Sequence, residues 1–102
     1  MQRFRVGFRP LAEADLIALY DRIASQSGEA AAEAYVARIE ATCRALATFP
    51  ERGTRRDDLM PGLRTIGFER RATIAFRVAA SEVVIVRIFY GGRDYERRLR
   101  EP

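Results

Sequence analysis

Histidine, lysine and tryptophan are absent from this chain of 102 residues, and Cys43 is its only cysteine. A single cysteine excludes an internal disulfide bond and a site built from several thiolates. The lack of histidine removes the commonest general base and metal ligand of proteins. We therefore expect no metal and no other cofactor. We interpret Cys43 as a core residue, because free cysteine is among the most often buried residue types.

Long apolar runs are missing as well. No run approaches the roughly 20 apolar residues that a membrane-spanning helix needs, and the first five residues intersperse charged with apolar side chains instead of leading into a signal-peptide core. We expect a cytoplasmic protein without membrane contact. The composition, 48% hydrophobic and 31% charged, is typical of one globular domain over residues 1–102. Residues 91–102 are expected to form a short basic tail.

The basic residues of the chain are all arginine. There are 18 of them against 14 acidic residues, which gives a net charge of +4. Such a charge suits association with nucleic acid or with an acidic protein, because the arginine fork pairs with phosphate and carboxylate alike. Genomic base composition explains the preference for arginine over lysine equally well.

The spacing of apolar residues predicts a strand and then two helices. Phe4, Val6 and Phe8 alternate with polar residues or glycine, which is typical of a strand with one apolar face. A helix is predicted over residues 10–25, and a second helix, capped by Ser27, is predicted to end at Pro50. The short joint favours an antiparallel helical hairpin, followed by an exposed loop over residues 50–62.

The remainder of the chain predicts three strands, over residues 63–68, 72–78 and 83–90. The element order is therefore β-α-α-β-β-β, an α+β fold in which an antiparallel sheet is packed on one face by the helical hairpin. Strand alternation assigns Ile74, Phe76, Val84, Val86 and Ile88 to the face under the helices. The same alternation assigns to the open face the residues Arg64, Arg77 and Arg87 beside Ile85 and Phe89.

Arginine mixed with large apolar side chains is typical of an interaction surface. We therefore predict that Arg64, Arg77, Ile85, Arg87, Phe89 and Tyr90 bind a partner. An ordinary solvated sheet face is the alternative for the open face, since protein surfaces tolerate scattered apolar residues. For Tyr90 the alternative is an aromatic side chain that ends a strand.

Five stretches of the chain together resemble the ParE toxins of the RelE/ParE superfamily. They are residues 8–16 (FRPLAEADL), 34–39 (AYVARI), 46–53 (LATFPERG), 61–64 (PGLR) and 86–94 (VRIFYGGRD). The resemblance implies a helical hairpin on an antiparallel sheet, a ParD-type antitoxin that wraps the toxin with its C-terminal segment, and DNA gyrase as the target of the free toxin. Relatives of the RelE type instead cut messenger RNA on the ribosome.

The residues that the chain lacks favour the gyrase inhibitor over the nuclease. RNA cleavage by 2′-hydroxyl attack needs a proton acceptor and a proton donor, whereas arginine stays protonated. Without lysine or histidine, the chain offers for proton transfer only Tyr90, Tyr95 and scattered carboxylates. The family often has histidine where this chain has Tyr90, which further weakens the nuclease interpretation. A basic binding module without toxicity is a third interpretation.

Two further hypotheses concern the partners. An antitoxin segment is predicted to lie across the helical hairpin and the sheet edge, with exposed Ile85 and Phe89 as apolar contacts, so that Phe89→Ala would speed dissociation of the complex. The tail residues Arg93, Arg97, Arg98 and Arg100 are predicted to engage gyrase or its bound DNA, since the family's C-terminal part is implicated in toxicity. A frayed, solvated chain end is the alternative for the tail.

Overall fold

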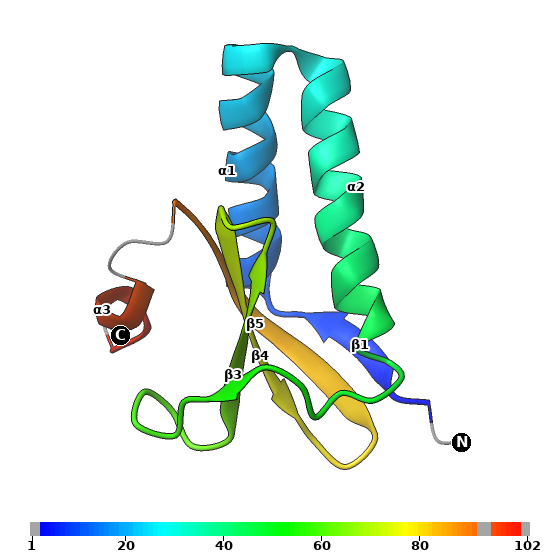
Figure 1. Cartoon of the computed structure of the whole chain (residues 1–102), viewed down its shortest axis with the longest axis vertical. Coiled ribbons are helices and arrows are strands. Elements are labelled where there is room, and N and C mark those ends of the chain that lie inside the picture. The colour runs from blue at the N-terminus through cyan, green and yellow to red at the C-terminus, as the bar shows by residue number, and fades with distance from the viewer. Residues whose placement is uncertain (1–2, 92–94, 101–102) are drawn as a thin grey trace.

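A hairpin of two long helices lies on one face of a five-stranded sheet, and a short third helix lies beside the sheet (Figure 1). The structure, a computed structural model, describes residues 3–91 and 95–100. The elements are β1 (Arg5–Phe8), α1 (Pro10–Ser27), α2 (Glu29–Ala45), β2 (Thr54–Arg55), β3 (Leu63–Phe68), β4 (Ala72–Val78), β5 (Glu82–Tyr90) and α3 (Tyr95–Arg100). No helix within the described residues is long and apolar enough to cross a membrane.

The α+β class and the hairpin on one sheet face are confirmed. The sheet has the order β1-β5-β4-β3-β2. The predicted antiparallel pairing is confirmed for the last four strands, whereas β1 runs parallel to β5, so the sheet is mixed and the prediction is wrong for β1. Periodicity shows which residues form strands, but it carries no information about the relative direction of two strands that are far apart in the chain.

Gly28 alone joins the two long helices. It is the N-cap of α2 with a φ of 94°, a left-handed conformation that glycine adopts without steric cost. Its N–H donates to the carbonyl of Ala24, which closes the end of α1. Ser27 therefore still belongs to α1, and the prediction that its side chain caps the second helix is wrong.

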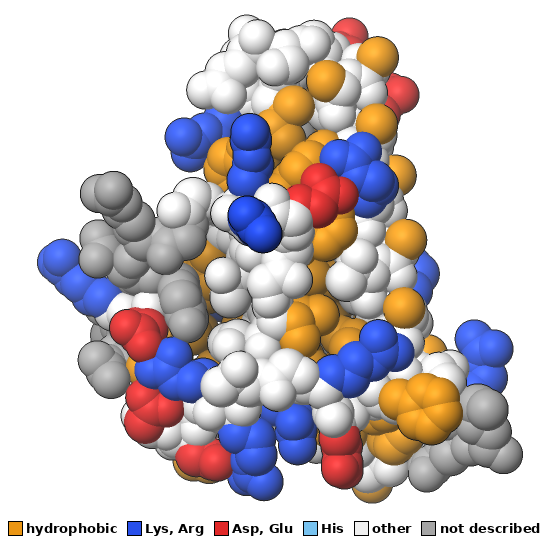
Figure 2. Space-filling model, viewed as in Figure 1, with side chains coloured by type: hydrophobic (Ala, Val, Ile, Leu, Met, Phe, Trp, Pro, Cys, Tyr) orange, Lys and Arg blue, Asp and Glu red, His pale blue; other side chains and the backbone are white. Residues whose placement is uncertain are grey.

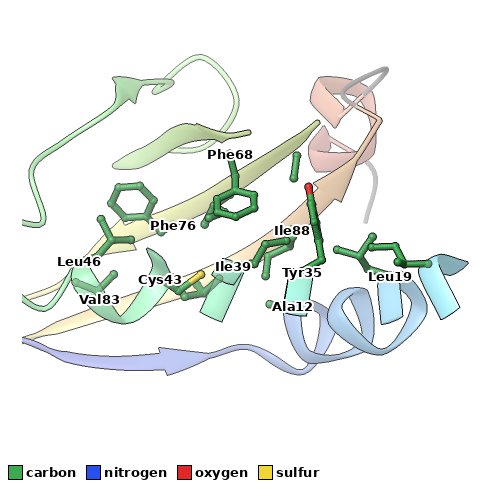
Figure 3. Close-up of a cluster of buried hydrophobic side chains, with 14 of the residues drawn as sticks. Ala12, Leu19, Tyr35, Ile39, Cys43, Leu46, Phe68, Phe76, Val83 and Ile88 are labelled. Atoms are coloured by element: carbon green, nitrogen blue, oxygen red, sulfur yellow. The ribbon is translucent and has the colours of Figure 1, made fainter. Parts of the chain in front are cut away.

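The main core lies between the helical hairpin and the sheet (Figure 3). Residues without exposed surface come from both layers: Ala12, Ala32, Ile39, Cys43, Leu46, Ile74, Phe76, Val83 and Ile85. Cys43 is thus the predicted core residue, and its burial raises the pKa of the thiol to about 12. A thiol with such a pKa stays protonated at neutral pH and is a poor nucleophile.

A β-bulge in β5 changes which side chains face the helices. Ala75 pairs with Arg87 and the next residue of β4, Phe76, pairs with Ile85, so Val86 is one extra residue on β5. A bulge of this kind reverses the alternation of the strand on which it lies. Before the bulge Val83 and Ile85 pack under the helices, and after it Ile88 and Tyr90 do so. The predicted assignments of Val84, Val86 and Ile85 to the two sheet faces are therefore wrong.

Candidate functional site

The open face of the sheet is largely covered by the chain itself. A second buried cluster forms there from Leu63, Ala75 and Phe89, and the partly buried side chains packed against it are Leu59, Met60, Val86 and Leu99. Phe89 is only 2% exposed and Ile85 is completely buried. The prediction that both are exposed is wrong, because the bulge turns Ile85 toward the helices, whereas Phe89 lies in a cluster completed by the loop before β3 and by α3. Neither side chain is available to a partner in this fold.

Helix α3 accounts for part of the predicted tail. Its Leu99 packs on the open-face cluster, its Glu96 forms an ion pair with Arg56, and the guanidinium of Arg98 lies 5.5 Å from the ring centroid of Phe89. Residues 95–100 thus form a helix that packs on the fold through Leu99. Arg97 and Arg98 are exposed on this helix, whereas Arg93 and the side chain of Arg100 lie outside the part of the structure that is described.

Arg87 forms an internal ion pair with Asp15 of α1. Its Nε and Nη2 donate to the two carboxylate oxygens at 2.8 and 2.9 Å, and each side chain of the pair is only 14% exposed. The hydrogen bonds to Asp15 raise the pKa of Arg87. The same carboxylate accepts the backbone N–H of Ile88 at 2.9 Å.

The carboxylate of Asp15 provides a hydrogen-bond acceptor for a backbone N–H at the edge of β5. β1 pairs with β5 only as far as Ile85, so the edge of β5 beyond that point needs other hydrogen-bond partners. The role of Asp15 was not among the predictions from the sequence. Its place on the buried side of α1, three residues after Ala12 and four before Leu19, is the signal that could have indicated it.

The structure separates Arg64 from Arg77. Arg64 pairs with Phe76 in the sheet and therefore lies on the helix side of it, where its Nη1 donates to the carbonyl of Arg52 at 3.3 Å. Arg77 pairs with Leu63 and lies on the open side. The predicted group of three arginines on one face is therefore wrong for Arg64.

Tyr90 packs on the helix-covered side at the end of β5. Its ring makes an edge contact with Tyr35 at 5.9 Å between centroids, and the guanidinium of Arg22 lies 5.3 Å from its centroid. A hydrogen bond with Tyr90 is the main cause that raises the pKa of Arg71. Figure 2 shows hydrophobic side chains in this region between the upper parts of α1 and α2, flanked by basic side chains. Tyr90 has the contacts of a strand-end aromatic that closes the core.

Among the grooves on the described surface, one lies along the helical hairpin and another lies beside Arg77 and Arg87. The first, here called the hairpin groove, has a volume of about 440 Å³ and lies between α1 and α2; it is lined by Phe8, Glu13, Leu16, Ile17, Tyr20, Val36, Glu40 and Arg44. Ile17 is 65% exposed at this groove. The second, here called the arginine groove, has a volume of about 400 Å³ and lies between α3 and the start of α1; it is lined by Arg9, Pro10, Leu11, Met60, Arg77, Val86, Arg87, Arg98 and Leu99.

Comparison with known proteins identifies the family. The family model for the ParE toxin of the type II toxin–antitoxin system, parDE, matches residues 6–95. The chain belongs to the ParE toxin family. It is also 35% identical over 77 residues to Toxin ParE3 of Caulobacter vibrioides, with 76% of each chain covered.

Solved structures agree with this assignment of a ParE-family fold. A chain of the chromosomal ParDE toxin–antitoxin system from P. aeruginosa matches with a TM-score of 0.76 and 30% identity, covering 86% of this chain and 96% of that one. The toxin–antitoxin complex RelBE2 from Mycobacterium tuberculosis matches with a TM-score of 0.63 and 22% identity, covering 88% and 93%. The second similarity is one of fold alone.

The two grooves of this ParE-family chain differ in chemistry. The hairpin groove is apolar with charges of both signs at its border, which suits an amphipathic helix. Among the described residues, the lining of the arginine groove contains guanidinium groups and no acidic side chain, which suits an anion. Arginine can stabilise charge there, but it cannot accept a proton.

Proposed function

We propose that this protein inhibits growth by binding DNA gyrase in the cytoplasm and that a ParD-type antitoxin holds it inactive. The match of the ParE family model over residues 6–95 carries the proposal. The character of the arginine groove supports binding over RNA cleavage, because the described residues of its lining offer cations and apolar side chains but no proton acceptor. Asp15, the carboxylate next to it, is already bound to Arg87 and to the backbone of Ile88.

We expect the purified toxin to inhibit supercoiling by DNA gyrase and to leave RNA intact. A positioned proton acceptor or donor contributes about a hundredfold to ten-thousandfold to a rate, and the chain contains no histidine or lysine for this role. Supercoiling of plasmid DNA and cleavage of messenger RNA on translating ribosomes are measured side by side with the same preparation. Defined cleavage of ribosome-bound RNA that Tyr90→Phe abolishes, together with unaffected gyrase, would establish the RelE-type nuclease instead.

We place the antitoxin contact in the hairpin groove. The apolar residues of its α1 side, Leu16, Ile17 and Tyr20, follow the spacing with which one helix presents a continuous face. An amphipathic segment of a ParD-type antitoxin fits such a groove, because it can bury its apolar side chains there while its polar ones meet Glu40 and Arg44. The similarity to a chain of a ParDE system from P. aeruginosa supports this choice of partner.

Ile17→Glu should weaken the antitoxin complex by about 30-fold or more, mainly through faster dissociation. The substitution places a charge in an apolar contact, and it leaves the fold intact because the side chain of Ile17 is already 65% exposed. Surface-immobilised antitoxin measures both rate constants. Ala14→Glu is the matched control, since Ala14 is exposed on the same helix outside the groove. Equal dissociation rates for the two variants would place the antitoxin elsewhere.

A further inference from the structure

We propose that the arginine groove binds an acidic peptide segment with apolar side chains, contributed by the target protein of the toxin. The inference rests on the proposed function in one respect, namely that the toxin acts on a protein. The groove is formed by parts of the chain that are distant in sequence: the start of α1, the open side of β4 and β5, the loop before β3, and α3. Its volume of about 400 Å³ is within the range of ligand-binding pockets.

All charged side chains among the described residues that line the groove are arginines. Four arginines line it, and among the described residues only Arg87 has an acidic partner, Asp15. Within the described part of the chain, Arg9 and Arg77 form no ion pair, and Arg98 contacts the ring of Phe89 and no carboxylate. Three guanidinium groups around one groove attract an anionic ligand and can form paired hydrogen bonds with its carboxylates.

The apolar lining distinguishes a peptide from a nucleic acid. Leu11, Met60, Val86 and Leu99 lie between the arginines, and Leu11 is a large exposed apolar side chain. Single-stranded nucleic acid binds by stacking its bases on exposed aromatic rings, and duplex DNA binds through a row of phosphate contacts. None of the described side chains that line this groove is aromatic, and the ring of Phe89 beneath it is buried. Apolar side chains between carboxylates match this surface better.

The arginine groove and the hairpin groove share no lining residue. A variant of one groove therefore leaves the contacts of the other in place, so that binding of the target and binding of the antitoxin can be tested separately. The arginine groove also lies on the side of α3, whereas the described N-terminal end of the chain lies on the opposite side of the sheet (Figure 1). Arg3, exposed at that end, is a matched control for loss of one positive charge.

The test measures binding of a fluorescein-labelled peptide of alternating glutamate and leucine to the purified chain by fluorescence anisotropy. The same peptide with glutamine in place of glutamate tests the need for carboxylates, and a short DNA duplex tests the nucleic-acid alternative. We expect Arg77→Gln and Arg98→Gln each to weaken binding of the acidic peptide by about threefold to fivefold, as for partly exposed ion pairs. The glutamine peptide should bind at least about tenfold more weakly, and Arg3→Gln should have no effect.

The double variant Arg77→Gln/Arg98→Gln should also lose most of its inhibition of growth while it keeps the affinity of the unchanged chain for the antitoxin. Equal binding of the two peptides, or binding that neither substitution weakens, would overturn the inference. Preferred binding of the DNA duplex, reduced by Arg77→Gln, would overturn it in favour of a nucleic-acid site. The peptide measurement and the gyrase assay are independent tests. Failure of peptide binding would contradict only the arginine-groove inference, and failure to inhibit gyrase would contradict only the proposed function.

Discussion

Replacement of Asp15 by alanine should lower the free energy of unfolding by about 3–5 kcal/mol, as for removal of one member of a buried ion pair. The substitution removes both hydrogen bonds to the guanidinium of Arg87 and the hydrogen bond to the backbone N–H of Ile88. Because both side chains of the pair are 14% exposed, water can replace the lost carboxylate only in part. Urea denaturation followed by circular dichroism measures the change.

A second ion pair with the same geometry provides the control. Arg38 and Glu69 also form two hydrogen bonds, at 2.8 and 3.1 Å, but their side chains are 51% and 42% exposed. Glu69→Ala should therefore lower the free energy of unfolding much less than Asp15→Ala does, because exposed ion pairs contribute little to stability. If Asp15→Ala cost no more than Glu69→Ala, the ion pair of Asp15 and Arg87 would not be a principal contact between α1 and β5.

Much of the fold follows from local patterns of the sequence. β3 and β4 have the predicted bounds, and β5 begins one residue earlier than predicted. α1 begins at Pro10, which suits the first turn of a helix because the N–H that proline lacks would have no partner there. These elements could be predicted because alternation and helical spacing are properties of a few neighbouring residues.

The candidate site could be predicted only in part, because it depends on contacts between distant residues. The extra residue Val86 reverses the alternation within β5, and a periodic pattern cannot show where such a reversal occurs. The two sheet faces were therefore assigned correctly for Arg77 and wrongly for Ile85. α3 packs on the open face through Leu99, and one leucine in a segment rich in arginine is too weak a signal for prediction.

Substitution of Phe89 distinguishes the predicted exposed contact from the buried core residue that the structure shows. If Phe89 were an exposed contact residue, its replacement would change only the affinity for a partner. In the structure Phe89 is only 2% exposed and lies in a cluster with Leu63 and Ala75. Phe89→Ala should therefore lower the free energy of unfolding of the isolated chain by about 3 kcal/mol or more, through lost burial and the cavity that remains. That is a large share of the roughly 5–15 kcal/mol that stabilises a typical domain. Chemical denaturation of the isolated chain measures it.

Phe49→Ala is the matched control, since the side chain of Phe49 is 68% exposed and its loss should change the free energy of unfolding by no more than about 0.5 kcal/mol.

The cluster that contains Phe89 also supports α3, because the ring contacts the guanidinium of Arg98 and the cluster packs against Leu99. Phe89→Ala should thus loosen one wall of the arginine groove and weaken binding of the acidic peptide even at temperatures at which the variant is folded. A variant as stable as the unchanged chain that dissociates faster from the antitoxin would instead show that Phe89 is a surface contact.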